Sequence, residues 1–249
     1  MEVSNVAIVT GASRGLGHAL ALELLRQDTQ LITVARSHDT GLAAQAKESG
    51  CPLHQIQADL SDPDAAQMAA DQISASLPPS AKRYLLINNA GTVEPINQAV
   101  DLIDAAATAR AFNLNVTSVI TLTAAFLRAT HGVTDRRILN ISSGAGRNPT
   151  PGWGVYCATK AALDHYTQVL NAENHGVRVA SLAPGVIDTG MQELIRRSDA
   201  SNFPDVERFA AMHEHSQLSS PTAVAAKILR YISQDDFGAT VLDDIRNYA

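Results

Sequence analysis

The sequence predicts an α/β fold in which a doubly wound parallel sheet of about seven strands carries helices on both faces. Short apolar runs alternate with longer helical patterns along the whole 249-residue chain. These runs are apolar throughout rather than at every second residue, which is typical of parallel strands buried on both faces. No repeat, low-complexity linker or break in composition divides the chain, so residues 1–249 are predicted to form one domain.

The strands are predicted from the short apolar runs and the helices from the longer stretches between them. The strand candidates are Val6–Thr10, Leu31–Ala35, Leu53–Gln57, Tyr84–Asn88, Arg137–Ile141, Arg178–Leu182 and Ala239–Leu242. The helix candidates are Gly15–Arg26, Thr40–Ser49, Pro63–Ser76, Thr108–Thr130, Val155–Glu173 and Pro221–Ser233. The exception to this regular alternation of strands and helices is Thr189–Ser219, which is polar and contains Pro204. We expect it to be an insertion over the carboxyl edge of the sheet, where loops commonly form substrate lids.

A glycine-rich loop follows the first predicted strand and leads directly into a helix. It has the sequence Thr10-Gly11-Ala12-Ser13-Arg14-Gly15-Leu16-Gly17. Glycines allow a tight turn and let backbone N–H groups approach a pyrophosphate, which sits at the positive N-terminus of the helix. The position between strand and helix favours a nucleotide site, and hence a Rossmann-type fold, over a plain turn.

The end of the second predicted strand indicates which cofactor this loop holds. NAD enzymes carry a carboxylate here for the adenosine ribose, but this chain has Ala35-Arg36-Ser37. Arg36 and Arg14 supply two guanidinium groups, each able to bind a phosphate through two parallel hydrogen bonds. We therefore expect NADPH/NADP+. The alternative is that Arg36 is a solvated residue at the end of a strand.

Tyr156 and Lys160 lie four residues apart on a predicted helix, and Ser143 lies thirteen residues before the tyrosine. This spacing puts the phenol and the ammonium on one helix face, one turn apart. Because a nearby cation favours the phenolate, we expect the pKa of Tyr156 to be lowered from its ordinary value of about 10. Together with the glycine loop, the pair predicts a nicotinamide-dependent carbonyl reductase.

Composition excludes several other classes of protein. The net charge is −6 without a basic block, which argues against a nucleic-acid partner. Cys51 and Cys157 lack metal-type spacing, as in a reduced intracellular protein. The start of the chain lacks a signal-peptide pattern, and no apolar run approaches the ~20 residues of a membrane span, so we expect a cytoplasmic protein without a membrane partner. His213-Glu214-His215 predicts no metal site, because residues two apart do not share a helix face.

With these residues assembled, the chain resembles the short-chain dehydrogenase/reductase family along nearly its whole length. The matching segments are Thr10–Gly17, Asp59-Leu60, Asn88-Asn89-Ala90-Gly91, Asn115, Ile141-Ser142-Ser143, Tyr156 with Lys160, and Pro184-Gly185 followed by Thr189. Their number and their order make the resemblance very specific.

The resemblance implies a role for each matching residue. Tyr156 would donate a proton to the substrate carbonyl oxygen, and Ser143 would hydrogen-bond the same oxygen. Lys160 would hold the nicotinamide ribose, and Asn115 would carry a water that connects Lys160 to solvent; the alternative is that Asn115 is an ordinary buried amide. The implied cofactor contacts are Gly11, Ser13, Arg14, Gly15, Leu16, Gly17, Arg36, Asp59, Leu60, Asn89, Ala90, Gly91, Tyr156, Lys160, Pro184, Gly185, Val186 and Thr189. The family's dimers and tetramers imply a homodimer or homotetramer.

Within the family, the chain is most similar to sepiapterin reductase and to bacterial benzil (1,2-diketone) reductases. The segments that carry this similarity are Asn140–Ser143, Gly152–Cys157, Asp188–Leu194 and Asp235–Val241. This similarity implies a small ketone or vicinal dicarbonyl as the substrate. Ser143, Trp153, Met191, Asp243 and Asp244 are the candidate substrate contacts, and Arg147 also borders the expected pocket. Trp153 fits stacking on a flat ring and a core or interface role equally well. The sequence does not decide between the two aspartates, and packing is the default role of Met191.

Two other enzyme functions keep the same chemistry: reduction of a 3-oxoacyl thioester and a hydroxysteroid-type dehydrogenase. A third alternative, from a different class, is an NADP-sensing protein that has the fold but does not turn over. Such sensors typically lack the tyrosine or the lysine, whereas Ser143, Tyr156, Lys160 and Asn115 are all present here.

Overall fold

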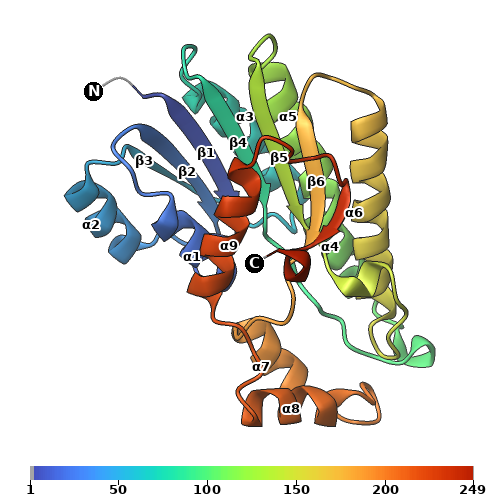
Figure 1. Cartoon of the computed structure of the whole chain (residues 1–249). Coiled ribbons are helices and arrows are strands. Elements are labelled where there is room, and N and C mark those ends of the chain that lie inside the picture. The colour runs from blue at the N-terminus through green and yellow to red at the C-terminus, as the bar shows by residue number, and fades with distance from the viewer. Residues whose placement is uncertain (1–2, 249) are drawn as a thin grey trace.

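A computed structural model of the chain describes residues 3–248 and contains one seven-stranded parallel sheet in that range (Figure 1). The strands are β1 (Asn5–Thr10), β2 (Thr29–Ala35), β3 (Leu53–Gln57), β4 (Arg83–Asn88), β5 (Asp135–Ile141), β6 (Arg178–Ala183) and β7 (Leu242–Asp244). Their order in the sheet is β3-β2-β1-β4-β5-β6-β7. The order therefore reverses between β1 and β4, which is where doubly wound sheets bind their ligands. The predicted fold class is confirmed.

Helices cover both faces of the sheet (Figure 1). The α-helices are α1 (Gly15–Glu23), α2 (Thr40–Ser49), α3 (Pro63–Ser76), α4 (Ala105–Phe112), α5 (Ser118–Ala129), α6 (Gly154–Ala172), α7 (Gly190–Arg196), α8 (Val206–Glu214) and α9 (Pro221–Ser233). Shorter turns are η1 (Ala99–Asp101), η2 (Asn113–Thr117), η3 (Gly144–Gly146) and η4 (Ile245–Asn247).

The strands divide their side chains between two cores because successive residues of a strand point to opposite faces. In β1, Ala7 and Val9 pack in the core under α1, α2 and α9, together with Leu20. Val6 and Ile8 pack in the core under α3, α5 and α6, together with Phe126. Both faces of the central strands are thus buried, as the uninterrupted apolar runs predicted.

Two helices on the β3 side of the sheet begin at aspartates that cap them. Asp39 accepts a hydrogen bond from the Leu42 backbone N–H at 2.9 Å at the start of α2. Asp62 accepts one from the Asp64 N–H at 2.9 Å at the start of α3, where Pro63 occupies the first helical position. A side-chain oxygen at the N-cap satisfies N–H groups that have no partner within the helix.

Several predicted boundaries are wrong. The last strand is not Ala239–Leu242 but β7, Leu242–Asp244, because the chain meets β6 in register only from Ser181 opposite Leu242. Gly238 has a φ of +90° and packs against the Val179 backbone, so the residues after it are still turning. The first helix ends at Glu23 rather than Arg26, with Leu24 as its C-cap.

The long helix predicted at 108–130 begins earlier and is interrupted. It runs as α4, η2 and α5 from Ala105 to Ala129, and η2 is a π-helical turn centred on Asn115. Such turns are rare and often occur at functional sites. The 189–219 segment is more regular than expected, because it contains α7 and α8. It lies at the carboxyl edge of the sheet, at the bottom of Figure 1. None of the helices within residues 3–248 is long and apolar enough to cross a membrane.

Three arginines converge on one aspartate at the opposite, amino-terminal edge of the sheet. Asp135, the first residue of β5, pairs with Arg83 at 2.6 Å, Arg178 at 2.7 Å and Arg137 at 2.9 Å. Burial by itself raises the pKa of the Asp135 carboxyl, but the hydrogen bonds from the three guanidinium groups outweigh it and lower the pKa to about 2. The cluster ties the starts of β4, β5 and β6 together.

We expect Asp135→Asn to lower the free energy of unfolding at pH 7 by about 2 kcal/mol, since one pKa unit corresponds to about 1.4 kcal/mol. The folded-state pKa lies below the ordinary value of 3.8, so this stabilisation is present above about pH 4 and is lost as the pH falls towards 2. Urea unfolding from pH 7 to pH 2 measures both effects.

The control for this experiment is Asp71→Asn on the exposed side of α3, where the carboxylate accepts from Gln67 rather than from an arginine. A difference between wild type and Asp135→Asn that stays constant from pH 5 to pH 2 would contradict the role of the carboxylate charge.

Candidate active site

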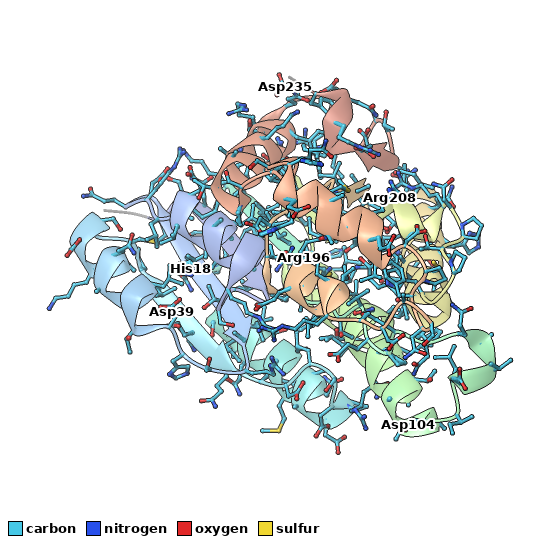
Figure 2. All side chains as sticks on the ribbon, turned by 90° about the horizontal axis from the view of Figure 1, so that it is seen from below. His18, Asp39, Asp104, Arg196, Arg208 and Asp235 are labelled. Carbon is cyan, nitrogen blue, oxygen red and sulfur yellow. The ribbon has the colours of Figure 1, made fainter. Side chains whose placement is uncertain are left out.

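A cleft of about 1030 Å³ opens at the carboxyl ends of the central strands, at the point where the strand order reverses. The glycine loop, the loop after β4, the loop after β5 with α6, and the 189–219 segment all contribute to its lining. Figure 2 views the molecule from this side, and Arg196 of α7 and Arg208 of α8 lie in the middle of the view. The cleft joins the two halves of the sheet, as expected for a doubly wound fold.

The glycine loop is shaped by close backbone approach. Gly11 and Gly15 have left-handed φ values of +68° and +57°, which glycine adopts without strain. A Cβ on Gly17 would lie 2.2 Å from the Gly11 carbonyl oxygen and 2.4 Å from Asn89 Nδ2. No side chain caps the start of α1, so the N-terminus of the helix is open to the cleft. The loop therefore fits a pyrophosphate, which is bound by backbone N–H groups and by the helix dipole.

Arg36, Asp59 and Leu60 line the cleft beyond the ends of β2 and β3. Arg14 lines it from the glycine loop, and an added Cβ on Gly190 of α7 would lie 3.9 Å from its guanidinium. The pKa of Asp59 is lowered, chiefly by the Ser61 backbone N–H that it accepts at 3.0 Å and to a smaller extent by the nearby Arg36. Another acid lies close in the sequence to the end of β2 but has a different role. Asp39 caps α2 and lies 3.3 Å from His18 Nδ1, away from the cleft lining (Figure 2).

Tyr156, Lys160 and Ser143 lie together at the middle of the cleft. Tyr156 and Lys160 are one turn apart on α6 and are 7% and 4% exposed. The Lys160 ammonium donates to the Ile141 carbonyl oxygen at 2.7 Å and lies 5.8 Å from the centre of the Tyr156 ring. Ser143 follows β5, and its hydroxyl accepts from the Ala145 backbone N–H at 3.1 Å. The sequence spacing thus brings the three side chains to one place.

The expected lowering of the pKa of Tyr156 is wrong for this structure. Burial raises the pKa of the Tyr156 phenol to about 12, and the adjacent Ser143 hydroxyl offsets only part of the rise. Burial also lowers the pKa of the Lys160 ammonium to about 8, against the smaller opposite effect of Asp164. The spacing of the two residues reveals the charge of Lys160 near the phenol but not the loss of water around both groups. The phenol is consequently protonated at neutral pH.

Asn115 does not line the cleft but holds one of its walls. Its side-chain amide donates to the Thr92 carbonyl oxygen at 2.8 Å and to Thr159 Oγ1 at 3.0 Å, and it accepts from the Thr92 N–H at 2.8 Å. A Cβ on Gly91 would lie 3.2 Å from Asn115 Oδ1 and 3.7 Å from Lys160 Nζ. Asn115 therefore joins the loop after β4 to α6 beside Lys160, as a buried amide whose bonds are made within the protein.

Trp153 belongs to an aromatic cluster beneath the 189–219 segment. Its ring stacks on Phe203 at 4.8 Å between centroids, packs against Phe209 at 5.4 Å and meets the edge of Tyr156 at 5.5 Å. Phe203 is fully buried. Phe203 occupies one face of the indole, which gives Trp153 a core role, and Trp153 also lines the cleft. Neither phenylalanine was predicted from the sequence, although two aromatic residues in an otherwise polar segment are a usable signal.

The two aspartates near the C-terminus lie in different surroundings. Asp244 lines the cleft, whereas Asp243 does not and is buried: its carboxylate accepts the Asp244 N–H at 2.8 Å and the Tyr248 hydroxyl. Arg147 also lies away from the cleft lining, because its guanidinium binds Asp164 and the Ser181 carbonyl oxygen. The expectations for Asp243 and Arg147 as pocket residues are therefore wrong.

The remaining candidate site residues lie together in the cleft. Met191 and all the residues implied as cofactor contacts line the same cleft, from Gly11 in the glycine loop to Thr189 at the start of α7. Three further residues line the cleft but were not predicted from the sequence: Gln192, Phe209 and Arg246. Two of these lie on helices of the segment that was expected to be irregular, and Arg246 follows the strand whose position was misassigned.

The comparison with family models gives the class of the protein. The model described as short chain dehydrogenase matches residues 5–200, which cover most of the sheet and the centre of the cleft. The chain belongs to this family of oxidoreductases.

The chain is also similar to individual members of this family. The chain is 35% identical to a benzil reductase ((S)-benzoin forming) of Bacillus cereus, over 92% of this chain and 94% of the relative. It is 36% identical to sepiapterin reductase of Rattus norvegicus, over 93% and 92% of the two chains. Among solved structures, that of the KRED1-Pglu enzyme has a TM-score of 0.82 at 30% identity, with 95% of this chain and 99% of the other covered. The recognition from sequence is confirmed.

We expect Phe203→Ala to loosen the 189–219 segment selectively, because it removes the ring stacked on Trp153 and leaves a cavity, a change that costs about 3 kcal/mol in a packed core. Trp153 is the only tryptophan, so its fluorescence reports on this cluster alone. The variant should show red-shifted emission and stronger acrylamide quenching while the sheet remains folded.

Phe237→Ala is the matched control, since Phe237 is 2% exposed but lies in the core under α9. It should lower the melting temperature without changing native Trp153 emission. Equal quenching in the two variants would show that Phe203 does not hold the segment.

Proposed function

We propose that the protein is an NADPH-dependent carbonyl reductase that transfers hydride to a small ketone or vicinal dicarbonyl. One observation carries the proposal: Tyr156, Ser143 and Lys160 line the same cleft as a glycine loop that fits a pyrophosphate. A proton donor and a hydrogen-bond donor beside a nucleotide site are what carbonyl reduction requires.

Tyr156 is the proposed acid. Its pKa of about 12 keeps the phenol protonated, so it donates a proton to the carbonyl oxygen as negative charge develops there. Ser143 hydrogen-bonds the same oxygen and stabilises that charge. Lys160 is anchored by the Ile141 carbonyl oxygen and keeps a positive charge near the phenol. Asn115 fixes the loop that closes this side of the cleft, and a water linking Lys160 to solvent remains part of the proposal.

The cofactor, when bound, supplies the hydride. Gly11–Gly17 would hold its pyrophosphate, Asp59 with Leu60 its adenine, and Asn89–Gly91 the adjoining ribose. Lys160 would hold the other ribose, with Pro184–Val186 and Thr189 beside the nicotinamide. Arg36 lines the cleft beyond the end of β2 and Arg14 lines it from the glycine loop, so both guanidinium groups are available to bind a 2′-phosphate. This arrangement supports NADPH over NADH.

The substrate end of the cleft is largely apolar. Val93, Trp153, Ile195 and Phe209 line it beside Tyr156, and Met191 packs against them. Such a pocket suits a carbonyl flanked by hydrocarbon or aromatic groups. The similarity to benzil and sepiapterin reductases supports a vicinal dicarbonyl within this class.

We also propose a cytoplasmic homodimer or homotetramer. Three apolar side chains are exposed on the outer faces of the helices beside the cleft: Phe112 of α4, Ile120 of α5 and Val169 of α6. Burial of such side chains against a second copy favours association.

A panel of carbonyl compounds followed by NADPH absorbance tests the proposed function. We expect benzil and diacetyl to have a kcat/KM at least about tenfold above that of an acetoacetyl thioester or a steroid ketone, because relatives of this chain are named for the reduction of a diketone. The arginines at this end, Arg208 and Arg246, are already paired with acids and are not free to bind a polar thioester. Preference for the thioester would overturn the assignment.

Tyr156→Phe in the same assay should reduce kcat by about 10²-fold or more while NADPH still binds, since the variant lacks only the proton donor. Tyr166→Phe, a change of the same kind on the same helix but outside the cleft lining, is the control and should retain turnover.

Arg36→Ala should raise the KM for NADPH by about tenfold and that for NADH by less than about twofold, because a charge-assisted bond to phosphate is worth about 1.5 kcal/mol or more. Steady-state kinetics with both cofactors measure the ratio. Lys47→Ala removes an exposed charge from the neighbouring α2 without touching the cleft and controls for a change of net charge. An equal effect of Arg36→Ala on both cofactors would contradict the 2′-phosphate contact.

A further inference from the structure

A carboxylate and a guanidinium share the rim of the cleft near its substrate end. Asp244 ends β7 and Arg246 lies in the turn that follows, and both line the cleft. The Arg246 side chain lies against Gly185, where an added Cβ would be 3.9 Å from its Cγ. Gly185 belongs to the loop after β6, which the proposed function places beside the nicotinamide, so the pair lies where a substrate would meet the reacting end of the cofactor.

Arg246 occupies both oxygens of the Asp244 carboxylate. Oδ1 accepts the Arg246 backbone N–H at 2.9 Å and Nε at 2.8 Å, and Oδ2 accepts Nη2 at 2.5 Å. The Asp244 side chain is 18% exposed and that of Arg246 is 73% exposed, so the guanidinium covers the acid from the solvent side. These bonds lower the pKa of the Asp244 carboxyl, which keeps it charged and paired.

Contacts of Asp243 and Tyr248 fix the backbone of the turn that carries the pair. Asp243 accepts the Asp244 N–H and the Tyr248 hydroxyl, and its carbonyl oxygen accepts from Arg147 at 3.0 Å. The Tyr248 ring packs edge-on against buried Tyr231 at 4.8 Å. Because the backbone is fixed on both sides of Arg246, its side chain loses less freedom on pairing than that of an ordinary surface arginine.

This arrangement separates two kinds of carbonyl substrate. A free carboxylate recognises a planar ring with adjacent N–H donors, as in the amino-pyrimidine edge of a pterin, through two parallel hydrogen bonds. Asp244 cannot form both of these bonds while it is paired, because Oδ1 already accepts two hydrogen bonds and Oδ2 accepts one. Breaking the pair with Arg246 would cost the ligand part of its binding energy. Benzil has no N–H group and is unaffected. The relatives of this chain include reductases named for each kind of compound.

We propose that Arg246 is a specificity-determining residue that masks Asp244 and thereby selects against amino-pyrimidine substrates in favour of hydrocarbon-flanked diketones. The proposal rests on the proposed carbonyl reductase function, of which it specifies the substrate class.

Binding of pterin itself tests this proposal without turnover, since pterin has the amino-pyrimidine edge and is fluorescent. Fluorescence titration of the full-length protein should show that Arg246→Ala binds pterin at least fivefold more tightly than wild type. Arg246→Lys should fall between the two, because an ammonium does not engage both oxygens in the same fork geometry. In Arg246→Ala/Asp244→Asn the gain should disappear, since the acceptor charge is gone.

Arg208→Ala is the matched control. Arg208 also lines the cleft, is 70% exposed and pairs with an acid, Asp205 at 3.7 Å, so its removal opens the rim equally without freeing Asp244. It should leave pterin affinity within twofold of wild type. No gain in Arg246→Ala, the same gain in Arg208→Ala, or a gain that persists in the double variant would each overturn the proposal.

Turnover separates this proposal from the proposed function. Arg246→Ala should raise kcat/KM for sepiapterin at least fivefold and change that for benzil less than twofold. If neither compound is reduced by any variant, the carbonyl reductase function fails, while the pterin titration still decides whether Arg246 masks Asp244.

Discussion

The burial of Lys160 is the constraint on which the rest of the site depends. An ammonium that is 4% exposed needs partners and close packing, and it has the Ile141 carbonyl oxygen at 2.7 Å. Two glycines make the approach possible. A Cβ on Gly146 would lie 2.8 Å from the Lys160 carbonyl carbon. One on Gly91 would crowd Asn115 Oδ1 at 3.2 Å and would contact Lys160 Nζ at 3.7 Å. The loops after β4 and β5 are thus shaped around one residue of α6, and that packing also fixes the position of Tyr156 one turn away.

The sequence predicted those features that depend on local pattern. The sheet, the glycine loop and the alignment of Ser143, Tyr156 and Lys160 follow from apolar runs, glycine spacing and helical periodicity, which act over a few residues. The family model and the parallel sheet confirm the class and the fold. What the sequence did not predict depends on contacts between distant segments. The start of β7 is set by its register with β6, the π-helical turn by the bonds of Asn115 to Thr92 and Thr159, and the stacking of Trp153 by Phe203.

The pKa of Tyr156 is another property that the sequence did not predict, in this case for an electrostatic reason. Sequence spacing reveals that a cation is near the phenol but not how much water either group loses. In the folded chain desolvation is the larger effect and favours the neutral form of each group. It raises the pKa of the phenol and lowers the pKa of the ammonium. For a proton donor this direction is useful, because a phenol that ionised below neutral pH would have no proton to give.

Charge is distributed unevenly along the cleft of a chain whose net charge is −6. At the end of the cleft that the glycine loop and the end of β2 line, neither Arg14 nor Arg36 forms an ion pair within the described part of the chain. At the other end, Arg208 is paired with Asp205 and Arg246 with Asp244. An anionic ligand therefore gains most by placing its phosphates at the first end, since unpaired guanidinium groups in a cleft attract charge more strongly than paired ones. The second end is left close to neutral, and a neutral ketone loses little on entering it. The pairing of the arginines, rather than their number, thus gives the cleft its polarity.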